Sequence, residues 1–444
     1  MADIKKVGVI SLGCDKNRVD TEKMLAIITK KHTLETQIEK ADLIIINTCA
    51  FLESAREEAI SEIFSCYEYK KADKDKKIIV TGCLPQKFIS ELFDELVEVD
   101  AFLGVSDYDN ILEVIDRVCL GERVNAVGLP KGECGKERVL TTTNYAYLKV
   151  ADGCSNHCTY CLIPYIRGKY RSVELNDLIL EAKGLGKVNE LILVAQVTAR
   201  YGLDLQEKLT LTLLIKELSK LENILSIRLL YCYPENLTDE LIEEIKSNDK
   251  VIKYLDIPLQ HADDKILKLM NRKGTGQGYL DLINKLKNQI PNIAIRSTFI
   301  TGFPFEGEEE FNNLVNFIKK AKLFNAGFFA YSREEGTPAY RLGGQVEEKV
   351  KKSRLKKLYK TQLKVVKENN AKFIGKTIKV LAEGFDQEEM VYYGRAYFNA
   401  PDIDGKVYFF SSDIVEYGKY YDIDITTATD YDLYGERLWI YQQN

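Results

Sequence analysis

Residues 152–161 read Asp152-Gly153-Cys154-Ser155-Asn156-His157-Cys158-Thr159-Tyr160-Cys161. The thiolates of Cys154, Cys158 and Cys161 are close enough in sequence to converge on one cubane iron–sulfur cluster, which takes four ligands. Because no further cysteine follows until Cys232, one iron of such a cluster is left open to another molecule. The run therefore predicts a reactive cluster in this loop rather than a structural one.

A structural zinc site is the alternative for the same three cysteines. Structural zinc is enclosed by four ligands. The fourth would have to be His157, which lies between two of the cysteines, or the distant Cys134. Neither position suits a tetrahedral site, so the iron–sulfur interpretation is favoured.

Length and composition limit the classes of protein. The 444 residues are 45% hydrophobic and 29% charged, which suits two to four globular domains. No apolar run approaches the roughly eighteen residues of a membrane span, and the first residues lack the apolar stretch of a signal peptide. We therefore expect a cytoplasmic protein with no membrane partner, whose ten cysteines are thiols or metal ligands. The net charge of −5 gives no overall attraction to nucleic acid.

Three more cysteines each end an apolar, strand-like run near the start of the chain: Val7–Cys14, Leu43–Cys49 and Lys77–Cys83. Helical stretches such as 20–31 and 53–69 follow, which is the rhythm of βαβ units in a parallel sheet. The carboxyl ends of parallel strands share one edge, where such sheets bind ligands. We therefore expect the three thiols to converge on a second open cluster, although a single cysteine at a strand end is commonly a core residue.

Six further strand-like runs follow, at 147–150, 190–197, 226–233, 253–259, 294–302 and 326–331. Amphipathic helical stretches separate them, for example 209–221, 238–246 and 308–322. This alternation predicts a βα barrel that stops short of eight strands, with ligands at its carboxyl face.

The last two segments differ in charge. Residues 345–373 read as a helix with ten Lys or Arg and three Glu. We expect its charges to form a solvated face, packed through Val350, Leu355, Leu358 and Val366; contact with RNA is the alternative. Residues 374–444 alternate short β-rich runs with turns, and their six basic and thirteen acidic residues give a charge of about −7.

Together these patterns predict an α/β protein of four parts. They are an N-terminal doubly wound parallel sheet (1–130), a central partial (βα)6 barrel (140–344), a basic linker helix (345–373) and a C-terminal small antiparallel β-barrel (374–444).

The whole chain resembles the radical S-adenosylmethionine (SAM) methylthiotransferases, which join a three-cysteine domain, a radical-SAM barrel and a TRAM-like β-barrel. The C-x3-C-x2-C spacing with Tyr160 before the last cysteine is typical of their cluster loop. Residues 11–20, SLGCDKNRVD, resemble the RimO-type branch, which modifies an aspartate of small-subunit ribosomal protein S-twelve. The tRNA-modifying MiaB type tends to carry Gln-Met-Asn after that cysteine. Residues 331–339 and 399–405 also resemble the RimO type.

The resemblance implies two 4Fe-4S clusters. One, on Cys154, Cys158 and Cys161, would generate a deoxyadenosyl radical from SAM; the other, on Cys14, Cys49 and Cys83, would deliver sulfur. The radical would take hydrogen from the β-carbon of the target aspartate, which then receives sulfur, and another SAM supplies the methyl group. An external donor such as flavodoxin or ferredoxin is implied, because the chain shows no flavin or nicotinamide motif.

Further candidates for holding the cofactor are Tyr160, Gln196, Ser297 and Gly302. Ordinary turn or strand-end hydrogen bonds are the alternative role for the last three. Two departures from the family pattern affect this face. Gln196-Val197-Thr198 stands where Gln-Asp-Thr is common, which puts a carboxylate role there in doubt, and Phe305 replaces the usual glycine in the 302–306 turn.

The acidic terminal barrel favours a basic protein as partner, because it would repel a phosphate backbone. Two alternative functions also fit features of the sequence. One is tRNA adenosine methylthiolation of the MiaB type, with the same clusters. The other is a non-catalytic metal-cluster protein that binds RNA through its last domain.

Overall fold

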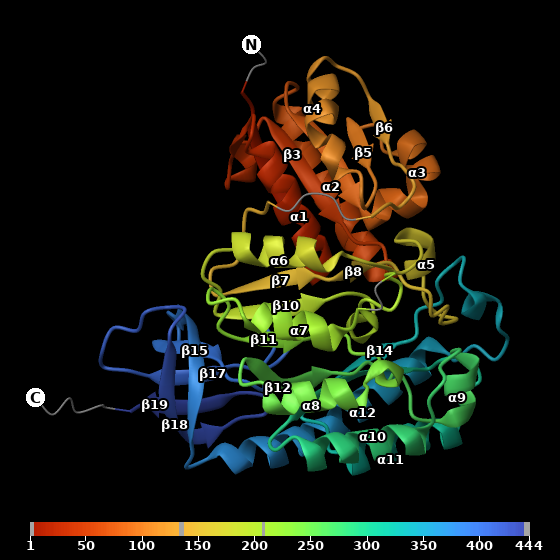
Figure 1. The fold of residues 1–444 in the computed structure, drawn as a ribbon. Helices are drawn as coiled ribbons and strands as arrows, with labels where there is room; N and C mark the ends of the chain where they lie inside the picture. Colours follow the sequence, from red (N-terminus) through yellow and green to blue (C-terminus); the bar gives the residue numbers. More distant parts are fainter. Residues whose placement is uncertain (1–3, 133–136, 207–208, 439–444) are drawn as a thin grey trace, which may run out of the picture.

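The computed structural model describes residues 4–132, 137–206 and 209–438. Its N-terminal unit is a six-stranded parallel sheet in the order β2-β1-β3-β4-β5-β6 (Figure 1). The strands are β1 (Lys6–Ser11), β2 (Thr33–Leu34), β3 (Leu43–Thr48), β4 (Lys77–Gly82), β5 (Ala101–Leu103) and β6 (Val124–Ala126). The helices are α1 (Asp15–Ile28), α2 (Glu53–Ala72), α3 (Cys83–Glu95) and α4 (Ile111–Cys119).

Both faces of this sheet are covered, as the doubly wound prediction requires. Alternate residues of β3 show it: Ile44 and Ile46 pack into one apolar cluster, whereas Leu43 and Ile45 pack into another. All four side chains are buried, which explains why the strand reads as a continuous apolar run.

The first helix begins earlier than the sequence pattern predicts. We expected it from residue 20, but α1 starts at Asp15, directly after Cys14. Gly13 turns the chain there with a φ of +94°, a conformation that glycine adopts at low cost. The carboxylate of Asp15 in the first turn also suits the positive end of the helix dipole.

The central sheet is parallel and open, in the order β14-β13-β12-β11-β10-β7. Its strands are β7 (Tyr145–Lys149), β10 (Glu190–Val194), β11 (Ile227–Leu229), β12 (Val251–Asp256), β13 (Ala294–Thr301) and β14 (Asn325–Ala330). Helices that pack on it include α6 (Leu175–Gly184), α7 (Leu211–Ser219), α8 (Asp239–Ser247), α10 (Gly276–Gln289) and α11 (Glu308–Ala321). The predicted six-stranded partial barrel is confirmed.

Some of these strands are shorter than predicted. The run 226–233 contains only β11, because Tyr231 takes a positive φ of 58° and the chain then enters a turn at Pro234–Asn236. Residues past the strand end are therefore free to line the carboxyl face of the sheet.

The linker helix α12 (Glu348–Asn370) packs along α11 and β14. Leu358 and Val366 are buried, as predicted. The expectation of a purely solvated charged face is wrong for Lys351 and Arg354, which are also buried. The Lys351 ammonium donates to the carbonyl of Tyr331 at 2.9 Å, and Arg354 donates to the Glu306 carboxylate at 2.8 Å. These bonds compensate for the loss of water around the two charges.

The C-terminal unit is a closed five-stranded barrel in the order β15-β16-β17-β19-β18. Its strands are β15 (Thr377–Asp386), β16 (Val391–Arg395), β17 (Val407–Phe410), β18 (Tyr420–Ala428) and β19 (Leu433–Arg437). Four pairings are antiparallel, as predicted, but β17 and β19 pair in parallel. The antiparallel description is therefore wrong for this pair, because β18 lies between the two strands in sequence.

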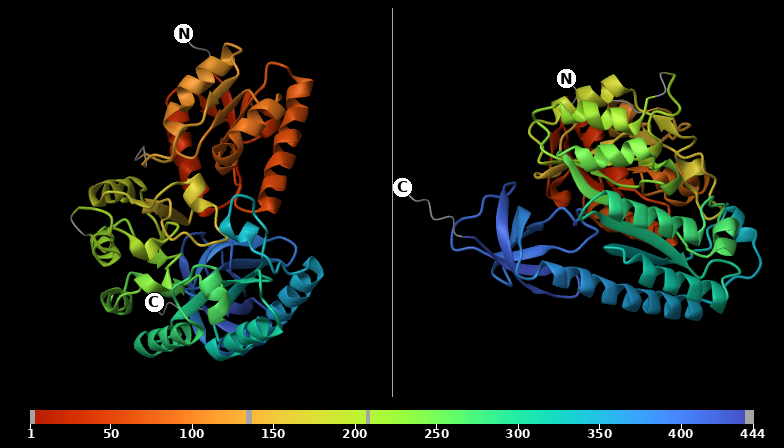
Figure 2. Two further views of the ribbon diagram at one scale, coloured as in Figure 1. Left: turned by 90° about the vertical axis from the view of Figure 1, so that its right-hand side faces the viewer. Right: turned by 60° about the horizontal axis from the view of Figure 1, so that its bottom comes forward.

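The terminal barrel covers the face of the central sheet that its helices leave open (Figure 2). Ile192, Val194 and Tyr254 of the sheet share one apolar cluster with Phe398 and Val380 of the terminal barrel. A buried ion pair adds to this contact. Within the part of the chain that the structure describes, no helix is both long enough and apolar enough to span a membrane.

That ion pair centres on Glu190 of β10. Its carboxylate accepts from Arg228 Nε at 2.5 Å and from Arg395 Nη1 of the terminal barrel at 2.9 Å. Burial opposes ionisation of Glu190, but the two guanidinium groups prevail and hold its pKa below the ordinary value of 4.5.

Replacing Glu190 by Gln leaves the buried Arg228 guanidinium without its carboxylate. We expect the free energy of unfolding to fall by about 3–5 kcal/mol, measured from the urea midpoint by circular dichroism. Because the pKa of Glu190 is lower in the folded state, its carboxylate stabilises the fold at pH values above its pKa in the unfolded chain. This stabilisation is lost as the pH falls through its pKa in the folded protein. The difference between the two proteins should therefore shrink below about pH 4.

The control is Glu217→Gln, because Glu217 pairs with Lys220 at a solvated site. It should cost less than about 1 kcal/mol. Equal losses in both variants would contradict a special role of Glu190 in docking the terminal barrel.

Candidate functional site

The three cysteines of the N-terminal unit lie together at one edge of its sheet. Cys14, Cys49 and Cys83 follow β1, β3 and β4, and the strand order reverses beside β1. The sulfurs of Cys14 and Cys83 lie 3.9 and 3.8 Å from the side-chain oxygen of Asn17. A Cβ atom at Gly13 would lie 2.8 Å from Cys49 Cβ. The predicted convergence of these residues at a switch point of the sheet is therefore present.

The second triad lies in the loop between β8 (Ala151–Asp152) and α5 (Ile163–Ile166). The amide of Cys154 donates to the carbonyl of Gly168 at 3.0 Å. The amide of Cys161 donates to the carbonyl of Cys158 at 3.1 Å. Gly153 takes a φ of +74°, and a Cβ there would lie 2.2 Å from the carbonyl oxygen of Lys169. Only glycine fits this position, so the loop begins from a fixed point.

The electrostatics show that the thiols of each triad are neighbours. Burial raises the pKa of Cys154 and Cys161, and the nearby Cys158 raises both further. In the other triad, burial raises the pKa of Cys83 to about 12, although Arg167 acts in the opposite direction. Bound iron would take these groups as thiolates.

Each triad offers thiol donors, the ligand type that iron–sulfur clusters take. Among residues 4–132, 137–206 and 209–438, no group of three or more His, Cys, Asp or Glu is arranged to hold one metal ion. Cys134, the distant candidate for a zinc ligand, lies outside the described residues. Three thiol donors without a fourth suit a cubane cluster with one open iron.

Arg167 connects the two triads. Its guanidinium is buried and donates to Asp152 at 2.9 Å and to Asn17 at 2.6 Å. It also pairs with Asp20 of α1 at 3.1 Å and lies 3.8 Å from Cys83 Sγ. Asp152 precedes the cluster loop, so a single side chain joins the N-terminal thiols to the base of that loop.

Asp152 is held ionised in this network. Burial opposes its charge, but Arg167 and Lys149 hold its pKa well below the usual range. Its second oxygen accepts from the Gly153 amide at 2.8 Å and from Gln196 Nε2 at 3.0 Å. The other polar atom of Gln196, Oε1, is buried without a hydrogen-bond partner among the described residues. A buried acceptor of this kind needs a partner that the described residues do not supply.

A cavity of about 230 Å³ lies between the two triads. Phe51 and Leu52, which follow Cys49, form one wall, and Tyr160 from the cluster loop forms another. Gln260 and Glu334 add polar groups. The carboxylate of Glu334 is fixed by the amide of Glu53 at 3.1 Å and by Arg56 at 2.5 Å. A group bound here would lie next to both cysteine loops.

Of the remaining predicted residues, Ser297 lies within β13 and Gly302 directly follows it. The Ser297 hydroxyl is buried and already bonded, donating to the carbonyl of Ile257 at 2.7 Å and accepting from the amide of Leu259 at 3.3 Å. The backbone amide of Gly302 donates to Glu306 at 2.9 Å. Both residues therefore have structural partners, and their cofactor role stays a prediction.

Sequence reasoning missed Arg167 and Arg272. Arg272 is buried, and its guanidinium carbon lies 3.9 Å from the centroid of the Tyr233 ring. Its positive charge lowers the pKa of Cys154, Tyr160 and Cys161, against the effect of burial. No local sequence pattern identifies either arginine, because their positions near the cysteines depend on tertiary contacts between loops that are distant in sequence. Arg167 follows the cysteine loop and Arg272 follows helix α9 (Asp264–Leu269), and neither position distinguishes them from other arginines.

The open six-stranded parallel sheet with a three-cysteine loop at its carboxyl edge defines a radical-SAM protein. The model of the radical SAM superfamily matches residues 148–318. A model described as "Uncharacterized protein family UPF0004" matches residues 6–104, and a TRAM domain model matches residues 374–438.

Full-length relatives are more specific. The ribosomal protein uS12 methylthiotransferase RimO of Thermoanaerobacter sp. (strain X514) is 46% identical over 98% of this chain and 100% of its own. The protein of the same name from Caldanaerobacter subterraneus subsp. tengcongensis is 47% identical, again over 98% and 100%. The chain therefore belongs to the RimO family of radical-SAM methylthiotransferases, and the membership confirms the family resemblance seen in the sequence.

Solved structures share the fold alone. TsrM from Kitasatospora setae, a radical SAM methyltransferase, matches with a TM-score of 0.53 and 12% identity, over 76% of this chain and 77% of its own. The cobalamin-dependent radical enzyme OxsB matches with a TM-score of 0.50 and 11% identity, over 82% of this chain and 56% of its own.

Replacing Arg167 by Met removes the guanidinium from Asp20, Asp152 and Asn17. Buried carboxylates that lose a partner are costly, so α1 should separate more readily from the cluster loop. We expect backbone amides of residues 15–28 to exchange at least about tenfold faster in the metal-free chain. Hydrogen–deuterium exchange mass spectrometry measures this change.

Arg117→Met is the matched control, because Arg117 lies in the same unit and pairs with Glu122 at an exposed site. It should leave the exchange of α1 unchanged. Identical exchange in the Arg167→Met variant and the unmodified chain would show that Arg167 does not hold this interface.

Proposed function

We propose that this chain attaches a methylthio group to the β-carbon of an aspartate of ribosomal protein uS12. The observation that carries the proposal is a cavity lined by residues of both cysteine loops, Phe51 and Leu52 after Cys49 and Tyr160 before Cys161. Residues after Cys49 form one wall of it and Tyr160 forms another. A substrate side chain there lies within reach of both loops, as sulfur insertion into a carbon–hydrogen bond requires.

We assign one 4Fe-4S cluster to each triad. Cys154, Cys158 and Cys161 hold the cluster that, when bound, supplies the electron for cleavage of SAM. Cys14, Cys49 and Cys83 hold the cluster at which sulfur is delivered. The chain's own groups fix these loops: Gly153 sets the start of the second loop, and Arg167 balances the negative charge that thiolates bring to the first.

The cofactor SAM is placed by residues at the carboxyl edge of the central sheet. Tyr160 lies in the loop itself, and Gln196 presents an unpartnered acceptor beside it. Ser297 and Gly302 support the site through the backbone of β13 and the turn after it. Arg272 is a further candidate, because its Nε atom is buried without a partner among the described residues.

The remaining parts of the proposal concern partners and boundaries. Flavodoxin or ferredoxin would supply electrons, and action on a ribosomal protein implies work in the cytoplasm. The acidic terminal barrel would attract basic uS12. We infer domain boundaries at residues 1–130, 140–344, 345–373 and 374–444, which agree with the separate sheets and the linker helix.

Two cysteine variants distinguish the roles of the triads. Cys158→Ala should abolish release of 5′-deoxyadenosine when the anaerobically reconstituted protein is reduced with SAM. Cys49→Ala should retain that release and lose methylthiolation of uS12. Liquid chromatography of the nucleoside and mass spectrometry of uS12 measure the two products. Cys119→Ala is a control that should change neither, because Cys119 is exposed on α4, away from both triads. Retained methylthiolation in Cys49→Ala would remove the first triad from the mechanism.

The substrate itself is tested in cells. A strain that lacks this gene should lose the methylthio group from uS12, while its tRNA nucleosides stay unchanged, because the chain belongs to the RimO family. Mass spectrometry of both pools measures this. Loss from the tRNA pool alone would instead support the adenosine-modifying alternative.

A further inference from the structure

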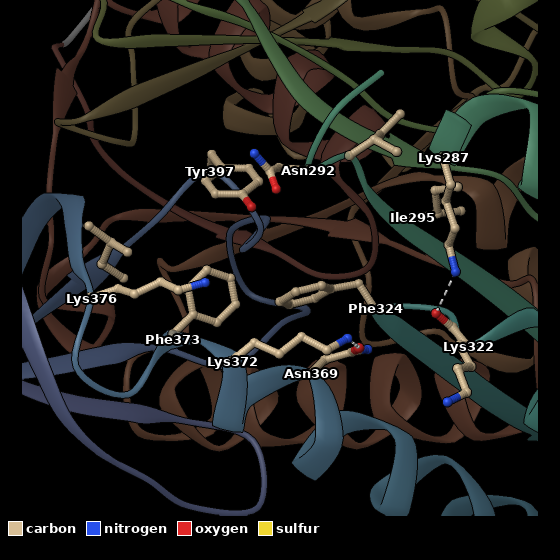
Figure 3. A pocket seen from close by; sticks show the side chains of 12 residues that line it. Lys287, Asn292, Ile295, Lys322, Phe324, Asn369, Lys372, Phe373, Lys376 and Tyr397 are labelled. Atoms are coloured by element: carbon tan, nitrogen blue, oxygen red, sulfur yellow. Dashed lines mark hydrogen bonds between the residues drawn. The ribbon is translucent and has the colours of Figure 1, made fainter. Parts of the chain in front are cut away.

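A second cavity, of about 450 Å³, is lined by lysines and aromatic rings (Figure 3). It is bordered by residues just before β13 and β14, by the end of α12 and by the start of β15. The cysteine triads lie at the carboxyl ends of their strands, whereas this cavity lies at the amino ends of the central sheet. Its volume is in the range of ligand pockets, which is roughly 300–1,000 Å³.

Four lysines line the cavity: Lys287, Lys322, Lys372 and Lys376. No carboxylate is among the twelve described residues that line it. The burial of Lys287 lowers its pKa, and the charges of Lys372 and Lys322 lower it further. Four ammonium groups gathered around one cavity repel one another, and a bound anion would relieve this repulsion.

The partners of these lysines leave most of the charge uncompensated. Lys287 donates to the carbonyls of Ala321 and Lys322 at 2.8 and 2.9 Å, and Lys372 donates to Asn369 at 2.9 Å. Among the residues that the structure describes, Lys322 alone of the four pairs with a carboxylate, that of Glu368 at 3.3 Å, and both side chains are well solvated. Such a pair is weak.

Aromatic rings form the floor of the same cavity. The rings of Phe324 and Phe373 lie 6.1 Å apart, and each packs on Phe398, at 4.9 and 4.6 Å. Tyr397 adds a third lining ring. Because these rings are held by one another, they offer a rigid surface beside the ammonium groups. Cations beside aromatic rings are the usual combination in sites for single-stranded nucleic acid.

The basic surface continues beyond the cavity. An adjoining groove of about 330 Å³ runs between α11 and α12 and shares Lys322 with the cavity. Its other lysines are Lys319, Lys357, Lys360 and Lys364. A continuous row of this kind suits a polymer with regularly spaced negative charges rather than a single small anion.

We propose that this cavity and groove bind a single-stranded segment of RNA, with the lysines on its phosphates and the rings against a base. An acidic protein segment would use the lysines but has no need of the rings, so RNA is the better match. The site is remote from both triads, so the RNA is a docking partner and not the reacting group. A ribosomal protein is found beside RNA, which gives such a contact a use in reaching the substrate.

Fluorescence anisotropy of the full-length chain with a labelled oligouridylate of about twelve nucleotides tests the proposal. Replacing Lys322, Lys372 and Lys376 together by Gln should weaken binding by at least about tenfold near 0.1 M salt. The slope of log Kd against log salt should fall by about 2, since each phosphate contact on a single strand contributes about 0.7.

The control is a triple Gln variant of Lys74, Lys183 and Lys187, which are exposed elsewhere. It should leave affinity and slope nearly unchanged. Equal weakening by both triple variants would overturn the proposal, because binding would then reflect total charge. Displacement of the RNA by polyglutamate as readily as by unlabelled RNA would overturn it in favour of an acidic protein partner.

Discussion

The structure depends most on the burial of one guanidinium, that of Arg167, at the boundary between the first two units. A charge in this position is tolerated only when every partner is in place. Asp20 and Asn17 come from α1, whereas Asp152 comes from the base of the cluster loop. One relative orientation of the two sheets satisfies all of them. The electrostatic requirement thus holds the two cysteine triads, which belong to different units of the chain, in one arrangement.

Much of the fold follows from patterns that the sequence carries locally. The continuous apolar run of β3 and the three cysteines at matching strand ends were enough to predict a parallel sheet with the thiols on one edge. The start of α1 could not be predicted in this way, because the apolar periodicity begins only at Val19, after a polar first turn. The contact between the terminal barrel and the central sheet could not be predicted either. That contact pairs residues such as Ile192 and Phe398, whose alternation predicts burial without naming the partner.

The residues of the candidate site also fall into those that the sequence predicted and those that it did not. Cysteine is a rare residue with few roles, so spacing alone marked all six candidate ligands. Arginine is common and usually solvated, and only tertiary structure separates Arg167 and Arg272 from their exposed counterparts. Ser297 shows the opposite error. Its predicted place on the ligand face suggested a cofactor contact, but its hydroxyl is bonded to the backbone of Ile257 and Leu259, just after β12. Lys351 and Arg354 were likewise predicted to face solvent. The sequence cannot show that the carbonyl of Tyr331 and the carboxylate of Glu306 lie beneath the helix as their partners.

The two triads differ in how far apart their members lie along the chain. Cys154, Cys158 and Cys161 occupy one short loop, so they can meet before any sheet has formed, at little cost in chain entropy. Cys14, Cys49 and Cys83 are separated by whole βαβ units and meet only after β1, β3 and β4 have paired. The Cys154 to Cys161 loop can therefore bring its thiols together without a folded sheet, whereas the N-terminal thiols meet only in a folded unit. A change that loosens the N-terminal sheet would thus disperse Cys14, Cys49 and Cys83 and leave the spacing of the short loop intact.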